Sequence, residues 1–368
     1  MRITGGEQIR QAVADAVAVL GTATDQDWSA TPAGSLSWSC RETVTHVASD
    51  LICYAGNLAG RARSAYVPFD ITVDGVGTSI DPADNAGLLH VLETTGALFT
   101  ATLDTTPRHV RAFHPYPFRS ANREGFAAMG VAEVLLHTHD LALGLGLAYV
   151  PRAELCRFVL TRIFPEVRPG TDPWQTLLWA TGRGDLPGRP RVTRWRWSNN
   201  MVLPSDRLTL EGATPAAAAD LAAGGDGGFE WIEGGPVDGT REGAGMLVKQ
   251  YEAGTHRPEW GMYVLVRDDD HLAVGAMGFH GVPDEEGRVE IGYDLAPPAR
   301  GHGYATEALR TLSAWALARE EVRTVFATVE PANTPSQAVL TRAGFTRVST
   351  PDDEDTLHAY ELRADRYR

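Results

Sequence analysis

Hydrophobic and polar residues follow different patterns in the two halves of the chain. Up to about residue 200, apolar residues recur at steps of three and four, which is the spacing of one helical face. The pattern predicts helices over 7–20, 39–62, 81–103, 123–145 and 152–164, followed by a tryptophan-rich tail. The first four are long and amphipathic, which favours an all-α, antiparallel four-helix bundle.

Two of these predicted helices carry start signals. Ser39 is followed three residues later by Glu42, the capping-box pattern, in which side chain and backbone satisfy each other's hydrogen bonds. Asp81 is followed by Pro82, a cap residue and then proline at the first helical position. Each signal marks the position at which a loop of the expected bundle ends and a helix begins.

After Asn200 the apolar residues alternate with polar ones in short runs. The runs predict strands over 205–213, 262–268, 272–281, 288–295, 324–330 and 357–363. An alanine-rich helix, a helix over 305–320 and a helix over 336–345 are expected between them. This order predicts an α/β or α+β domain with a mixed sheet. We place the boundary between Asn199 and Arg207, giving domains 1–200 and 201–368.

Composition and net charge limit the classes of molecule that we expect the protein to bind. The 368 residues fit two domains, and their formal net charge is −14, from 33 basic and 47 acidic residues. This charge argues against broad binding to nucleic acid or to an anionic membrane, but it allows a local basic site for a phosphorylated cofactor. Three scattered cysteines, no apolar leader and no run of about 20 apolar residues indicate a cytoplasmic protein without membrane spans.

The segment 298–308, PARGHGYATEA, lies between a predicted strand and a predicted helix. Its glycines let the backbone approach a ligand closely, and the first amides of the helix point at an anion. The segment therefore predicts a cradle for a phosphate chain. A tight turn that uses glycine only for packing is the alternative. The dinucleotide fingerprint is not met because Thr306 replaces its third glycine, and no Gly-Lys-Ser/Thr of a P-loop follows.

Three motifs in this half resemble the GNAT N-acetyltransferases, in their RimJ/RimL-like branch. SDRLTL at 205–210 resembles the opening strand of that branch, EIGYDLAPPARGHGYATEAL its central strand, loop and helix, and N-T-P-S-Q-A-V-L-T-R-A-G-F at 333–345 its last helix. Within the second of these, R-x-x-G-x-A at 300–305 matches the family's signature. The resemblance covers about 203–362 and implies an α+β GNAT fold with a mixed, mostly antiparallel sheet, and acetyl-CoA as donor. The cofactor-binding residues that it implies are Tyr293, Asp294, Leu295, Arg300, Gly301, His302, Gly303, Tyr304, Ala305, Asn333 and Ser336.

The implied chemistry is direct attack of an amine on the thioester, which needs a base and is helped by an acid. Glu290, on the strand before the cradle, is the candidate base through a water molecule, or else a solvated strand residue. Asn333 and Ser336 are expected near the thioester. Many relatives have a tyrosine acid seven residues after the asparagine, where this chain has Leu340, so that role is absent or passes to Ser336 or another group.

Polar residues on apolar stripes of the helical half suggest a metal site. Glu133 and His137 are four residues apart and share one helical face, and His46 on another helix can complete the set. A His2Glu set with an open position is a known catalytic zinc arrangement. His139 or Asp140 would orient the ligands. The alternative is a pair of hydrogen-bonded core histidines with a surface glutamate.

The segments WSCRETVTHV at 38–47, EVLLHTHD at 133–140 and LWATGR at 178–183 resemble the N-terminal domain of mycothiol-dependent maleylpyruvate isomerase, of the DinB-like superfamily. The resemblance covers about 5–185. It implies a DinB-like bundle, a metal held by His46, Glu133 and His137, zinc as that metal, and a thiol cofactor such as mycothiol. The isomerase's own C-terminal domain is missing here, so maleylpyruvate isomerisation itself is not expected.

Three functional hypotheses follow. The first is an N-acetyltransferase fused to a metal-binding, thiol-transferase-like bundle, with a small-molecule amine or a protein N-terminus as acceptor. The second is a bifunctional enzyme whose bundle performs mycothiol-dependent isomerase or S-transferase chemistry. The third is a bundle that only binds a ligand or mediates a homodimer.

Overall fold

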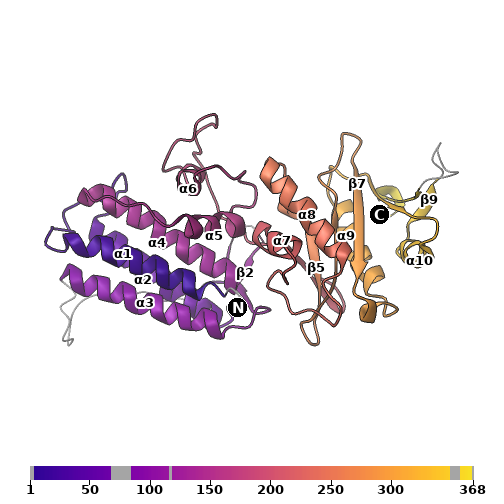
Figure 1. Cartoon of the computed structure of the whole chain (residues 1–368), viewed down its shortest axis with the longest axis horizontal. Coiled ribbons are helices and arrows are strands. Elements are labelled where there is room, and N and C mark those ends of the chain that lie inside the picture. The colour runs from indigo at the N-terminus through magenta and orange to yellow at the C-terminus, as the bar shows by residue number, and fades with distance from the viewer. Residues whose placement is uncertain (1–3, 68–83, 116–117, 349–356, 367–368) are drawn as a thin grey trace. The chain divides into compact units, whose positions relative to one another are not determined.

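The computed structural model describes residues 4–67, 84–115, 118–348 and 357–366. The chain divides into two compact units, residues 1–199 and 200–368, which are described separately. In Figure 1 the first unit is the helical part and the second contains the large sheet.

The N-terminal unit is built on four long helices that lie side by side (Figure 1). Helices α1 and α2 each pack against both α3 and α4, while α5 packs against α4 and α6. The bounds are α1 Gly6–Leu20, α2 Cys40–Ala59, α3 Asn85–Thr105, α4 Arg123–Leu145, α5 Ala153–Ile163 and α6 Pro173–Ala180. The five helices that the sequence pattern predicts are present, and α6 is an addition that it does not predict.

The helix starts follow the cap residues. Ser39 and Glu42 form the predicted capping box, with the Ser39 amide donating to Glu42 Oε2 at 2.8 Å. The start expected at Asp81 and Pro82 lies outside the described residues. Helix α3 is described from Asn85, with Asp84 accepting a hydrogen bond from the Ala86 amide as its cap. A short hairpin, β1 Arg111–Phe113 and β2 Ser120–Asn122, precedes α4 and has no signal in the hydrophobic pattern.

Helix α4 lies at the centre of this unit. Nearly all of its residues are buried, among them Phe126 and Met129, which have no exposed surface. Its polar residues Glu133, His137 and Asp140 are buried as well. Burying such groups costs free energy unless they form hydrogen bonds or ion pairs, so these three residues mark a candidate functional site.

The C-terminal unit contains an eight-stranded sheet in the order β3-β4-β5-β6-β7-β8-β10-β9. Among the strands of the described residues, only the β7–β8 pair is parallel, so the sheet is mixed and mostly antiparallel. The bounds are β3 Val202–Pro204, β4 Leu208–Gly212, β5 Met262–Arg267, β6 Ala273–Phe279, β7 Arg288–Leu295, β8 Thr324–Val329, β9 Thr346–Val348 and β10 His358–Arg363.

Helices cover both faces of this sheet. Helices α7 (Pro215–Ala222) and α8 (Asp238–Ala253) share an apolar core with alternate residues of β5, such as Met262 and Val264. Trp315 of α9 (Tyr304–Leu317) meets Phe279 of β6 on the opposite face. Helix α10 (Thr334–Arg342) packs on α9. The sequence pattern does not predict α8.

The one parallel strand pair separates before it ends. Residues 288–290 of β7 pair with residues 324–326 of β8, and the pairing stops at Glu290 with Phe326. Strand β7 nevertheless continues to Leu295, held on its other edge by β6. The edge of β7 from 291 to 295 is therefore open to a ligand where it faces away from β6.

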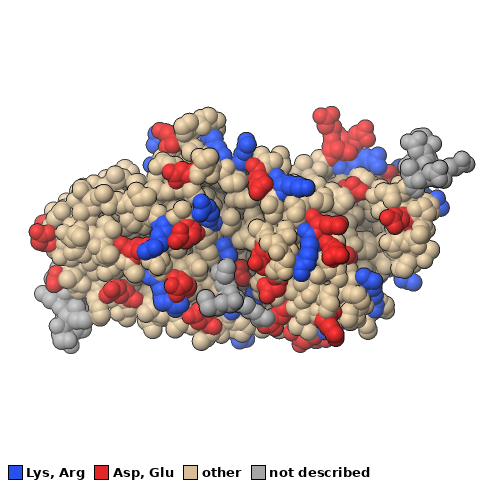
Figure 2. Space-filling model, viewed as in Figure 1, with Lys and Arg blue, Asp and Glu red and all other residues tan. Residues whose placement is uncertain are grey.

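The outer surface carries charges of both signs. On the face drawn in Figure 2, acidic and basic side chains alternate over each unit, and no large single-sign basic area is visible. Among the helices of the described residues, none combines the length and the apolar character needed to cross a membrane.

Candidate functional site

The separation of β7 from β8 opens into a large cleft of about 1260 Å³ in the C-terminal unit. Its walls come from the end of β7, the loop before α9, the first turns of α9, and α10. Every residue that the sequence assigns to cofactor binding, apart from Tyr304, lines it: Tyr293, Asp294, Leu295, Arg300, Gly301, His302, Gly303, Ala305, Asn333 and Ser336. Tyr304 begins α9 at the same place.

The loop before α9 has the geometry of an anion cradle. Gly301 and Gly303 have φ of 81° and 84°, in the left-handed region where a Cβ is strained. Gly303 is the N-cap of α9, and no side chain accepts the first amides of that helix. Nothing lies within 4 Å of the Cβ position of Gly301. The helix dipole and these amides can therefore receive a phosphate oxygen.

Glu307 holds this loop against the start of β4. Its carboxylate accepts hydrogen bonds from Ser205 Oγ at 2.7 Å, the Arg207 amide at 2.7 Å and Arg207 Nε at 2.8 Å. Burial raises the pKa of Glu307, but these hydrogen bonds outweigh it and the pKa is lowered. Arg207 also donates to the His302 carbonyl at 3.1 Å. The sequence pattern gives no role to either residue, because they are a hundred positions apart.

Four arginines line the cleft together with three carboxylates: Arg207, Arg300, Arg310 and Arg342, with Asp206, Asp294 and Glu307. Arg300 donates through Nε to the Leu295 carbonyl at 3.1 Å, which fixes the turn between β7 and α9. Guanidinium groups of this kind can bind phosphate oxygens.

At the inner end of the cleft, two hydroxyl groups meet. Tyr293 Oη on β7 lies 2.8 Å from Ser336 Oγ at the start of α10. Burial raises the pKa of Tyr293 although the Ser336 contact opposes it. Asn333 caps α10 by accepting from the Ser336 amide at 3.2 Å, so its side chain has a structural partner. Leu340 is buried at 1% exposure and offers no proton.

Glu290 lies at the point where β7 and β8 separate. Its Oε1 accepts a hydrogen bond from Thr328 Oγ1 at 2.8 Å, and its Oε2 is 3.1 Å from His280 Nδ1. The hydrogen bond with His280 is the largest cause of a lowered pKa at Glu290, and the bond from Thr328 acts in the same direction against burial. Glu290 is thus an anchored carboxylate rather than a freely solvated one.

A second, smaller cavity of about 290 Å³ lies between α8 and strands β5–β7. It shares Tyr293 and Asp294 with the large cleft, so the two cavities adjoin along the end of β7. Asp294 joins α8 to the sheet: its Oδ1 accepts from Thr240 Oγ1 at 2.8 Å and from the Ala276 amide at 3.2 Å. Burial is the main reason that its pKa is raised.

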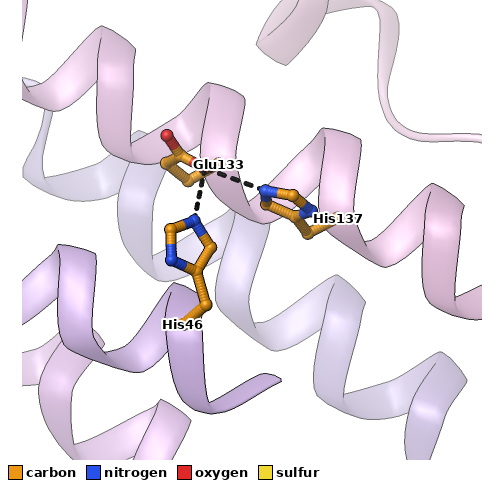
Figure 3. Close-up of side chains that lie close together, drawn as sticks. All are labelled: His46, Glu133 and His137. Carbon is orange, nitrogen blue, oxygen red and sulfur yellow. Dashed lines mark ion pairs between the residues drawn. The ribbon is translucent and has the colours of Figure 1, made fainter. Parts of the chain in front are cut away.

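In the N-terminal unit, His46 from α2 and Glu133 and His137 from α4 converge (Figure 3). Glu133 Oε2 is 3.2 Å from His137 Nε2 and 3.8 Å from His46 Nε2, and the three donor atoms lie within 4.8 Å of one another. Tetrahedral zinc with bonds of about 2.0–2.1 Å holds its ligand atoms roughly 3.3 Å apart. The donor set and its spacing therefore fit a divalent transition metal.

Asp140 lies beside the ring nitrogen of His137 that faces away from Glu133. His137 Nδ1 is 3.2 Å from Asp140 Oδ2, and Asp140 accepts from Arg183 Nη2 at 2.9 Å and from Arg183 Nε at 3.2 Å. Burial lowers the pKa of His137, but Asp140 and Glu133 outweigh it and raise the pKa to about 9. Of the two residues expected to orient the ligands, Asp140 is the one that lies beside His137, and its role at a metal stays a prediction. Arg183 was part of the LWATGR segment, without an assigned role.

Two further residues complete the surroundings. Asp50, one turn after His46 on α2, places Oδ2 3.3 Å from His46 Nε2. Burial, together with the charge of Glu133, raises the pKa of Asp50 to about 8. The Trp38 ring lies 4.7 Å from the His46 ring. The i,i+4 spacing of His46 and Asp50 is a signal that could have identified Asp50 from the sequence.

Comparison with known proteins finds similarity in the C-terminal half. Residues 207–346 match the family model described as acetyltransferase (GNAT) domain. The chain is 41% identical over 83 residues to the N-acetyltransferase YjdG of Bacillus subtilis, and 36% identical over 98 residues to the N-acetyltransferase p20 of Bacillus licheniformis. These matches cover 23% and 27% of this chain. The chain spans about half the length of these curated relatives, 49% and 51%.

Solved structures give weaker likenesses. An acetyltransferase of the GNAT family from Bacillus anthracis is 18% identical, with a TM-score of 0.33, covering 45% of this chain and 99% of the other. RimJ of Mycobacterium smegmatis, in complex with CoA-disulfide, is 21% identical with a TM-score of 0.32, covering 45% of this chain and 88% of the other.

Proposed function

We propose, from the GNAT acetyltransferase domain that the C-terminal half carries, that this protein transfers the acetyl group of acetyl-CoA to an amine. The observation that carries the proposal is the large cleft at the separated strands, with open helix amides at one end and four arginines along its walls. The amides at 301–305 would hold the diphosphate. The free edge of β7 at 293–295 would pair with the amides of the pantetheine arm.

The acceptor would enter through the smaller cavity. Its walls contain Glu242 and Asp294 and no lysine or arginine, and it adjoins the large cleft at Tyr293. A cationic amine would be attracted to such a site. We propose two classes of acceptor. One is a small-molecule amine, such as a metabolite, an antibiotic or a mycothiol-related aminosugar, and the other is a protein N-terminus.

The proton steps can be assigned to this chain's own groups. Glu290, the candidate base of the sequence analysis, lies beside the open part of the sheet with His280. The Tyr293 and Ser336 hydroxyls, 2.8 Å apart at the end of the cleft, are placed to donate to the departing sulfur, the role for which Leu340 is unsuited. Asn333 would act by fixing the start of α10 rather than by direct chemistry.

The test uses the full chain, acetyl-CoA and a panel of amines: kanamycin, glucosamine, spermidine, and short peptides beginning with serine or alanine. Release of CoA is followed with and without added zinc and mycothiol. We expect at least one amine to be acetylated, with the product confirmed by mass spectrometry. Absence of both acetyl-CoA binding and CoA release across the panel would refute the enzymatic function.

Gly303→Trp tests the cradle itself. The indole would occupy the path of the diphosphate, and we expect acetyl-CoA affinity, measured by calorimetry, to fall more than about 100-fold, equivalent to roughly 2.7 kcal/mol. Gly224→Trp is the matched control, because Gly224 also has a left-handed φ, of 95°, and open space around it, yet lines neither cavity. Equal affinities in the two variants would show that the cradle is elsewhere.

For the N-terminal unit we propose a metal site formed by His46, Glu133 and His137, with zinc as the first candidate. The convergence of three suitable donor atoms from two helices carries this proposal. The metal would supply a Lewis acid, and a site for a thiolate of the mycothiol class according to the resemblance noted above. Asp140 and Arg183 would hold His137 in its orientation.

Metal analysis of the purified protein tests this site. We expect about one zinc per chain in the wild type and a marked loss in His46→Ala and His137→Ala. His90→Ala is the control, since His90 lies exposed on α3 of the same unit. Zinc loss together with loss of a second, thiol-dependent activity would favour the bifunctional enzyme. Unchanged acetyl transfer with altered mass in solution would favour a ligand-binding or dimerisation role.

A further inference from the structure

The smaller cavity has a histidine at one end that the functional assignment has not used. His280 directly follows β6, its amide donates to the Glu290 carbonyl at 3.0 Å, and its side chain lines the cavity. We infer that His280 is the base that accepts the proton of the acceptor amine, with Glu290 as the residue that positions it. This inference rests on the proposed acetyltransferase function and names a catalytic residue within it.

The position of the imidazole supports this role. Nδ1 faces Glu290 Oε2 at 3.1 Å, and Nε2 lies 2.9 Å from where a Cβ on Gly292 would be. The imidazole ring therefore lies over Gly292. Gly292 is two residues beyond Glu290 on β7 and directly precedes Tyr293. Gly292 pairs with Gly278 of β6, so the sheet below the ring carries no side chains that would fill the cavity.

Glu290 is less suited to be the base. It is absent from the walls of both cavities, whereas His280 lines the smaller one. Its two oxygens are engaged, one with Thr328 and the other with His280, and its pKa is lowered by both contacts. A carboxylate of lowered pKa accepts protons poorly near neutral pH. It is, however, well placed to accept the Nδ1 hydrogen and leave Nε2 as the basic atom.

The charges around the cavity favour the same division of roles. The titratable groups lining it besides His280 are Glu242 from α8 and Tyr293 and Asp294 from β7, while β5 and β6 contribute no charged side chain. No lysine or arginine competes with a cationic acceptor there. His280 remains 43% exposed at its side chain, so that a proton can pass from Nε2 to solvent.

The step balances with these groups alone. Nε2 takes one proton from the bound ammonium, and the freed amine forms a bond to the thioester carbonyl carbon. The C–S bond breaks, its electron pair leaves on sulfur, and the second nitrogen proton ends on that sulfur. When His280 returns its proton to solvent, the products are the acetamide, CoA and one released proton.

His280→Gln tests the inference in the full chain, using the amine of the panel with the highest turnover. We expect kcat/KM to fall about 100- to 1000-fold, and acetyl-CoA affinity to stay within about twofold. The wild-type rate should rise with pH along a limb that requires the imidazole of His280. That limb should be absent in His280→Gln, whose rate should recover as the amine itself deprotonates at high pH.

Glu290→Gln and His271→Gln complete the experiment. As a positioning residue, Glu290 should give a smaller loss on substitution, about tenfold, with the histidine limb retained. His271 lines neither cavity, and its variant should match the wild type. A His280→Gln enzyme with near-normal kcat and an unchanged pH profile would overturn the inference. Wild-type protein inactive with every amine would instead overturn the proposed function.

Discussion

The two candidate sites are built from different parts of the chain. In the N-terminal unit, three side chains from two helices bring their donor atoms together, and the backbone around them is ordinary helix. In the C-terminal unit, the cleft is formed by backbone: a strand that leaves its partner and a loop whose glycines expose the first amides of α9. In a site made of side chains, a few atoms provide most of the binding free energy. In a site made of backbone, many contacts share it.

This difference predicts opposite responses to substitution. A single conservative change at a metal ligand removes one of three donors. A single side-chain change along the cleft removes one of many contacts and leaves the amides in place.

Glu133→Gln should give the largest effect. The amide keeps the size of the side chain but loses the charge, and we expect zinc affinity to fall more than about 100-fold, since loss of an outer partner alone costs about 10- to 100-fold. Competition with a chromophoric chelator measures it, and acetyl-CoA affinity should not change. Glu93→Gln, at an exposed residue of α3, is the control. Retained zinc in Glu133→Gln would exclude Glu133 as a ligand.

Asp140→Asn should weaken zinc binding by about 10- to 100-fold. Asparagine accepts the His137 hydrogen less strongly and no longer pairs with Arg183, so the imidazole is less firmly oriented. The same chelator competition measures the change. Asp15→Asn, which breaks a pair with Arg152 elsewhere in the unit, should leave zinc affinity intact. Equal affinities for these two variants would remove Asp140 from the site.

Arg342→Gln should weaken acetyl-CoA binding by only about tenfold, roughly 1.4 kcal/mol, because three other arginines and the helix amides remain. Calorimetry at two salt concentrations should also show a shallower salt dependence. Arg319→Gln, whose arginine lies over the Trp315 ring and not in the cleft, is the control. A loss as large as that of Gly303→Trp would contradict the view that binding is distributed.

Glu307→Gln should lower the free energy of unfolding by about 1 kcal/mol, since its hydrogen bonds to Ser205 and half-exposed Arg207 are weakened. The folded-state pKa of Glu307 is lowered, so its contribution is present above the unfolded-state value, about 4.3, and is lost as pH falls through the folded value. Urea unfolding should therefore separate wild type and variant at pH 7 and bring them together in acid, once the pH has fallen below the folded-state pKa of Glu307. A difference that persists in acid would contradict this linkage.

The fold of the C-terminal unit was largely predictable from local pattern. Alternating runs predicted most strands, and the R-x-x-G-x-A motif lies within residues 207–346, which match the acetyltransferase (GNAT) domain model. Helix α8 was not predicted, since its three glycines lower its helical propensity and contacts with the sheet stabilise it. The smaller cavity, which α8 encloses, was therefore not predicted either.

In the N-terminal unit the four-residue spacing predicted that Glu133 and His137 share one face of a helix, because four residues make about one turn. The DinB-like assignment of this unit, its metal and its thiol cofactor remain predictions. No local rule indicated that Arg183 would lie beside Asp140, or that Asp50 would lie beside Glu133 of α4.

The sequence by itself determined the helices and strands with strong periodicity, the glycine loop, and the pair of donors one turn apart, because each depends on residues a few positions from one another. Tertiary structure alone decided that His46 meets α4, that Glu307 holds the loop through Arg207, and that His280 lies beside Glu290 over a bare pair of glycines. Such contacts depend on how whole elements pack, and packing is settled by the sum of many weak apolar contacts that no short stretch of sequence contains.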